Sequence, residues 1–150
     1  MDADQHAQFD AMEQQMMAHP AVDCPVLHEF FPSGPGLVLY VRTVTFPAGT
    51  LVTGHEHKYH HPWTMARGLM EVIGDGDTLT VLSGPCSGIT EPGTRRVAKV
   101  HEETDFTTYH VVPAELDGDP DACVRYLTVE RHHLDGMKQP EPAALPGGGS

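Results

Sequence analysis

The chain has 150 residues, with 9 Lys and Arg against 21 Asp and Glu, for a formal net charge of -12. This length suits one domain with its own hydrophobic core, and the acidic balance argues against nucleic-acid binding, which needs a basic patch. No apolar run is long enough to span a bilayer and no signal peptide is evident, so we expect a cytoplasmic protein without membrane or nucleic-acid partners.

The first predicted element is a helix over Asp4–Ala18, which His19-Pro20 would end because the residue before a proline avoids the α region. Apolar residues recur on one face of this helix at Phe9, Met12 and Met16. We interpret this stripe as a packing surface, directed against the rest of the domain or against a second subunit.

From Gly36 onward the chain alternates short, partly apolar segments with turn residues, a pattern typical of an antiparallel sandwich or barrel. A polar turn is expected at His101–Asp105. The predicted strands are Leu37–Phe46, Leu51–His57, Gly68–Ile73, Thr78–Leu82, Arg95–Val100, Phe106–Val112 and Cys123–Glu130. The predicted organisation is thus a helical segment over residues 1–20, a β-barrel domain over 21–135, and a disordered, Pro- and Gly-rich tail over 136–150.

Four of the 11 histidines lie between His55 and His61. On a strand, His55 and His57 would share one face while Glu56 and Lys58 face water. Imidazoles that converge in an apolar interior usually bind a divalent metal, and His61 is close enough to supply a third nitrogen. A zinc-protease helix is excluded because the HExxH spacing fails at Tyr59. The remaining alternative is a solvated, His-rich loop without a metal.

The segment Gly49-x5-His55-x-His57-x3-His61-x6-Gly68 resembles the first cupin motif, with His61 where that motif usually has Glu. Pro92-Gly93 resembles the turn of the second motif, but Arg96 stands where its metal-binding His would be expected. HKYHHPWTMARG and PGTRRVAKVHEETDFTTYH are similar to small cupin-type proteins of bacteriophages and their hosts. The resemblance covers about Val26 to Val112 and implies an all-β fold, a double-stranded β-helix (jelly-roll barrel) with a short N-terminal helix.

The resemblance also implies a metal centre that lacks its usual fourth ligand. His110 is the candidate, because the cupin strand order would place it beside the strand that starts near His61; the alternative is a buried, hydrogen-bonded core histidine. Nitrogen donors suit one divalent transition metal, Fe, Zn, Ni or Cu. Without the motif Glu the charge of the metal stays uncompensated, which favours binding of anions.

The remaining candidates are side chains that could line the cavity. Arg96 would grip a carboxylate if it points inward, or lie salt-bridged at the barrel mouth if it does not. Tyr59 is the nearby hydroxyl that could act as an acid or base, so Tyr59 and Arg96 are the catalytic candidates. Other expected wall residues are Tyr40, Arg42, Trp63 and Tyr109.

The sequence therefore predicts a metal-binding cupin with His55, His57, His61 and His110 as ligands, acting as a small metalloenzyme on a small anionic molecule, such as a carboxylate. The alternative is a non-catalytic metal- or ligand-binding module, or a phage-related structural one. A homodimer through the N-terminal helix and the edge strands is a further expectation, because exposed edge strands need covering.

Overall fold

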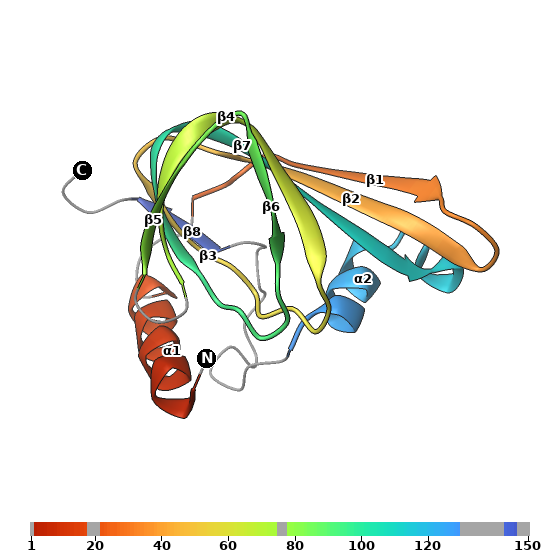
Figure 1. The fold of residues 1–150 in the computed structure, drawn as a ribbon, viewed down its shortest axis with the longest axis horizontal. Helices are drawn as coiled ribbons and strands as arrows, with labels where there is room; N and C mark the ends of the chain where they lie inside the picture. Colours follow the sequence, from red (N-terminus) through yellow and green to blue (C-terminus); the bar gives the residue numbers. More distant parts are fainter. Residues whose placement is uncertain (1, 18–21, 75–77, 130–142, 147–150) are drawn as a thin grey trace.

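The computed structural model describes residues 2–17, 22–74, 78–129 and 143–146. Most of them lie in antiparallel strands, and Figure 1 shows these strands wrapped into a barrel with a helix at either end. The elements are α1 (Ala3–Met17), β1 (Val26–Pro32), β2 (Leu37–Phe46), β3 (Thr50–Thr53), β4 (His61–Ile73), β5 (Leu79–Ser83), β6 (Cys86–Thr90), β7 (Val97–Pro113), η2 (Ala114–Leu116), α2 (Pro120–Leu127) and β8 (Ala143–Pro146).

The long strand β7 organises the barrel. Its C-terminal part pairs with β2 from Phe46↔Thr104 to Leu37↔Pro113, and its N-terminal part pairs with β3. On its other side β7 pairs with β4, which carries both β5 and β6 along its far edge. The strands β1 and β2 run out from the barrel as a long hairpin, with α2 beneath it (Figure 1).

Strand β4 bends where its register against β7 shifts, between Met65 and Met70. Gly68 lies in this bend with φ +121°, a backbone conformation that L side chains rarely adopt. A Cβ at this position would also lie 2.6 Å from the Cα of Thr104 in β7. Gly68 thus permits both the bulge and the close approach of the two strands, which curve the sheet around the interior.

The interior of the barrel is apolar. One cluster of buried apolar residues lies inside the barrel. A second lies between α2 and the strands β2 and β7. The first cluster contains Val44, Phe46, Val52, Trp63, Met65, Met70, Val72, Ala98 and Val100. The second contains Val38, Tyr40, Val112, Cys123 and Leu127.

The N-terminal helix forms as predicted, and Phe9 of its apolar stripe is 4% exposed. The helix is tied to the barrel by Arg95, whose side chain is 2% exposed. Its Nη1 donates to Asp10 Oδ1 at 2.7 Å and to the backbone oxygen of His6 at 3.1 Å, and the guanidinium lies 5.6 Å from the centre of the Phe9 ring. The helix therefore packs on its own domain.

Two predictions of secondary structure are wrong, one of a turn and one of a strand. The predicted polar turn His101–Asp105 is part of the continuous strand β7, because this segment pairs with β4 and, at its end, with β2, and Glu103 and Asp105 also bind Arg67 of the bent β4. The predicted strand Cys123–Glu130 is instead helical up to Leu127, where α2 ends, and Thr128 forms an isolated β-bridge with His57. The short strands β1 and β6 were not predicted.

Other parts of the prediction differ in detail. The strand β2 has the predicted bounds, whereas β3 ends at Thr53, before the histidines expected on it. Residues 143–146, inside the segment predicted to be a disordered tail, form β8, which pairs with β3. The rest of that tail, with residues 130–135, lies outside the described residues. Among those described, no helix is both long and apolar enough to cross a bilayer.

Helix α2 begins at a well-formed cap. Asp119 Oδ1 accepts a hydrogen bond from the backbone N–H of Ala122 at 3.1 Å, and Pro120 opens the helix. We expect Asp119→Ala to lower the free energy of unfolding by about 1 kcal/mol, measured by urea denaturation. Asp121→Ala, which removes a carboxylate from the same turn without removing a cap, is the matched control and should cost only a few tenths of that value. Equal losses in both variants would contradict the capping role.

Candidate metal centre

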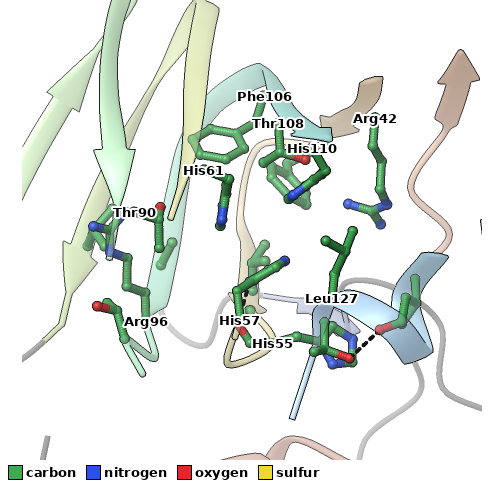
Figure 2. A pocket seen from close by; sticks show the side chains of 18 of the residues that line it. Arg42, His55, His57, His61, Thr90, Arg96, Phe106, Thr108, His110 and Leu127 are labelled. Atoms are coloured by element: carbon green, nitrogen blue, oxygen red, sulfur yellow. Dashed lines mark hydrogen bonds between the residues drawn. The ribbon is translucent and has the colours of Figure 1, made fainter. Parts of the chain in front are cut away.

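Three histidines meet inside the barrel, each on a different part of the chain. His61 is the first residue of β4, His110 lies near the end of β7, and His57 belongs to the loop between β3 and β4. One ligand atom from each lies within 4.8 Å of the others, and this is the metal-ligand group found among the described residues. The ring centres are 4.3 Å apart for His57 and His61, 4.6 Å for His61 and His110, and 5.3 Å for His57 and His110. Figure 2 shows the three rings pointing toward one another.

The loop that carries His57 is held by backbone hydrogen bonds to segments distant in sequence. The backbone N–H of Lys58 donates to the Leu127 oxygen and that of Val129 to the Glu56 oxygen, both at 2.8 Å. The N–H of Gly93 donates to the His57 oxygen at 3.1 Å. Although the loop has little regular structure, these contacts fix the position of its histidine.

His55 lies outside this group of three, although it lines the same cavity. Because β3 ends at Thr53, strand alternation does not apply to His55 and His57. His55 instead presents its backbone oxygen to His57 Nδ1 at 3.0 Å. A carbonyl only accepts, so Nδ1 of His57 carries the proton and Nε2 of the neutral ring keeps a lone pair for a ligand.

The buried histidines are held neutral. Burial lowers the pKa of His61 to about 4; the charge of Arg96 adds to this and the backbone of Tyr59 opposes it. Burial lowers the pKa of His110 to about 2, and the imidazoles of His61 and His57 and the charge of Arg42 act in the same direction. Nδ1 of His61 is buried and has no hydrogen-bond partner, so the Tyr59 backbone makes no well-formed hydrogen bond to it.

These features fit a transition metal. Three neutral imidazoles supply nitrogen donors without a compensating charge, and a buried ring nitrogen without a partner would otherwise be costly. The described residues around the cluster offer three ligand side chains, so a bound ion would keep positions open for water or a small molecule. The structure brings His110 into the triad that could bind a metal.

The cluster lines a cavity of about 150 Å³. Arg42 and Arg96 also line it, and none of the described lining residues is acidic. Most of the remaining wall is apolar: Phe46, Val52, Met70, Val72, Leu82, Ala98, Phe106, Val124 and Leu127. Arg96 thus contributes to the lining, and its Nε also lies 4.0 Å from where a Cβ on Gly74 would be.

Of the predicted aromatic walls, Tyr40 alone lines the cavity, within the part of the chain that the structure describes. Trp63 packs on Phe106 with ring centres 5.2 Å apart, and the hydroxyl of Tyr109 bonds to that of Thr64 at 2.9 Å. Tyr59 is 48% exposed and packs against Tyr126 outside the cavity. Its position therefore does not support Tyr59 as the acid or base.

Tyr40, which the sequence predicted only as a wall residue, makes a hydrogen bond that the sequence did not predict. Its ring is 1% exposed, and its hydroxyl lies 2.6 Å from Nδ1 of His28, an exposed residue on the neighbouring strand β1. Tyr40 is thus a described lining residue whose hydroxyl is in hydrogen-bond contact with an imidazole outside the triad. The alternation of β2 indicated an inward ring, but only the pairing with β1 reveals the contact with His28.

No protein-family model matches the chain, and no curated protein does. Among solved structures, the chain is similar to KdgF from Halomonas sp., with 21% identity over 55% of this chain and 86% of that one and a TM-score of 0.41. It is also similar to an RmlC-like cupin from Shewanella frigidimarina, with 20% identity over 55% and 82% and a TM-score of 0.39. A third is the cupin domain of Schizosaccharomyces pombe Cnp3, with 18% identity over 69% and 77% and a TM-score of 0.43.

The observed fold is an antiparallel β-barrel. This agrees with the fold expected from the motif at Gly49–Gly68. One fold can carry many unrelated activities, so the chemistry of this protein has to come from its own cavity, which combines a histidine triad with two arginines.

Proposed function

We propose that this protein binds one divalent transition metal through His57, His61 and His110 and acts as a metalloenzyme on a small anionic molecule. The observation that carries the proposal is the convergence of three ligand atoms within 4.8 Å in a cavity whose described lining contains arginines and no acidic residue. A metal held by neutral ligands keeps its full charge and favours an anion at its open positions.

The bound metal would supply Lewis-acid or O2 chemistry. The residues of this chain have separate roles around it. Arg42 and Arg96 attract and orient the anion, and the apolar wall excludes water. Tyr40 holds a proton at its hydroxyl and exchanges it with solvent through Nδ1 of the exposed His28.

A non-catalytic metal- or ligand-binding module is the second candidate. It is favoured by the position of Tyr59, which lies outside the cavity, and by the predominantly apolar wall. The two candidates differ in one result, namely whether the metal-loaded protein turns over the anions that it binds. Oxygen consumption would be followed for an iron form, and hydrolysis, lyase and isomerase assays for a zinc or nickel form.

The metal centre itself is tested by elemental analysis of protein purified without an affinity tag. We expect close to one metal per chain in the parent, and a loss of at least about tenfold in metal content in His57→Ala, His61→Ala and His110→Ala, because each removes one of three ligands. His55→Ala is the matched control. It keeps the backbone oxygen that bonds to His57, so it should retain metal near the parental level.

Two results would contradict the proposal. One is a folded parent that contains no metal and takes up none of Fe, Zn, Ni or Cu on reloading. The other is equal loss in the His55 variant and the three ligand variants, which would show that the cluster seen here is not the binding set. Circular dichroism of each variant separates loss of metal from loss of fold.

A further inference from the structure

One sheet of the barrel has an apolar outer side. Its strand order is β1–β2–β7–β4–β6, with the C-terminal part of β7 and the N-terminal part of β4 up to their shared bulge. Residues paired directly across antiparallel strands lie on the same face of a sheet. Phe31, Leu39 and Val111 are therefore aligned across three strands, and Leu27 and Leu37 share their face. We call this surface the outer sheet face, made of alternate residues in 27–31, 37–43, 107–113, 62–64 and 87–89.

The other side of the same strands faces the interior. Val38, Tyr40 and Val112 pack there against α2, which lies beneath the β1–β2 hairpin in Figure 1. The large apolar side chains of the outer sheet face remain accessible instead. The exposed fractions are 56% for Leu27, 45% for Phe31, 44% for Leu37, 54% for Val111 and 64% for Ile89. A contiguous apolar patch of this kind on a protein surface indicates an interaction site.

The outer sheet face also carries little charge. Among its described positions Glu29 is the one charged residue, although 20% of the chain is charged. The exposed Leu79 and Val81 of β5 form a contrasting patch, because Val81 pairs with Glu71, which in turn pairs with Lys99. Charged residues are depleted at the centre of protein interfaces. Of the two apolar patches, the outer sheet face therefore has the composition of an interface.

The charge of the chain indicates which partner fits this face. The net charge is -12, and almost none of it lies on the outer sheet face. A basic partner would be attracted to the acidic remainder of the surface rather than to this face. Two copies of this chain repel each other over that remainder and can approach closely where the charge is absent. Their shapes also match, since equally twisted sheets stack face to face with strand directions about 30° apart.

We propose that the protein forms a symmetric homodimer in which the outer sheet faces of two copies stack about a twofold axis. Strands about 4.8 Å apart make the sheet about 24 Å wide, and residues 37–43 extend over about 23 Å. Two stacked faces would bury about 1,100 Å² together, just above the roughly 1,000 Å² that a specific interface needs. This size predicts a dissociation constant in the micromolar range. The cavity lies on the inner side of the sheet and stays open.

The test is sedimentation velocity of the parent from about 1 to about 100 μM, over which we expect the mass to rise from one chain to two. Val111→Glu and Leu27→Glu each place one charge per copy in the interface, so each should weaken dimerisation at least about tenfold. The matched controls are Val81→Glu and Leu79→Glu on β5, where the same residue types are 60% and 57% exposed. Both controls should leave the dimer unchanged.

Oxidative footprinting of the parent at the two ends of this concentration range needs no variant, so it remains decisive if a substitution impairs folding. Leu27, Phe31 and Leu37 should react less at the high concentration, whereas Leu79 and Val81 should not change.

Four results would overturn the inference. They are a parent that stays monomeric at about 100 μM, a dimer that survives both substitutions on the outer sheet face, equal weakening by the β5 controls, and protection of the face that does not depend on concentration. The last result would show that another segment of the same chain covers the face. None of these measurements involves the metal, so the metal centre is tested separately.

Discussion

Acidifying the metal-free protein from pH 7 to pH 5 is expected to lower its free energy of unfolding by about 2 kcal/mol for each of His61 and His110. Their pKa values in the folded state are about 4 and about 2, below the ordinary value of 6.5. Between these values and 6.5 the unfolded chain binds a proton that the folded chain does not. Stability is therefore greatest above pH 6.5 and falls as the pH drops below it.

Urea denaturation of the chelated protein at the two pH values measures this effect. His110→Phe removes one titrating group while keeping a ring in the buried position, so its loss of stability on acidification should be about 2 kcal/mol smaller than that of the parent. His60→Gln, a replacement at an exposed position, is the control for removing a histidine. The same pH dependence in the parent and in the His110 variant would show that His110 is not held neutral by burial.

Replacing Arg95 is expected to have the second large effect. Arg95→Met removes a buried guanidinium that donates to Asp10 and to the His6 backbone oxygen and lies over the ring of Phe9. We expect a loss of about 3 kcal/mol in the free energy of unfolding, at the low end for a buried ion pair because Asp10 is 35% exposed and regains water. The region around α1 should also become sensitive to limited proteolysis.

The control for this experiment is Arg67→Met. Arg67 also contacts two carboxylates, those of Glu103 and Asp105, but its side chain is 55% exposed and water replaces most of what is lost. The decrease in stability should therefore be much smaller than for Arg95. An equal decrease in both variants, with no change in proteolysis at the N-terminus, would show that Arg95 does not anchor the helix.

The regular strands could be predicted because their signal is local. The segment Leu37–Phe46 alternates in a way that only a half-buried strand explains, and its bounds are those of β2. In contrast, the sequence around His101–Asp105 resembles a turn, and it forms a strand because its backbone pairs with β4 and, at its end, with β2, both distant in sequence. The helix α2 carried a local signal, Asp119-Pro120, but its apolar residues suit either a strand or a short helix.

The candidate site was predictable to a similar degree. His57 and His61 follow from their spacing and burial, whereas the role of His55 depended on where β3 ends, which the turn residues around Gly54 do not specify. His110 lies about 50 positions further along the chain, and only the pairing of β2, β4 and β7 brings it into the group. The contact between Tyr40 and His28 likewise depends on the register of β1. The narrower resemblance to phage-encoded cupins remains a prediction.

The anchoring of the loop that carries His57 has a consequence for the order of folding. This loop is fixed by Gly93, Leu127 and Val129, and its Glu56 lies 3.5 Å from His6 of α1. Contacts between residues so far apart in sequence form late, because closing long loops costs entropy before the contacts can offset it. We therefore expect the third ligand to reach its place only after the N-terminal helix and the segment that follows α2 have docked. A partly folded or truncated chain would present two of the three imidazoles, so tight retention of a metal would mark the completely folded protein.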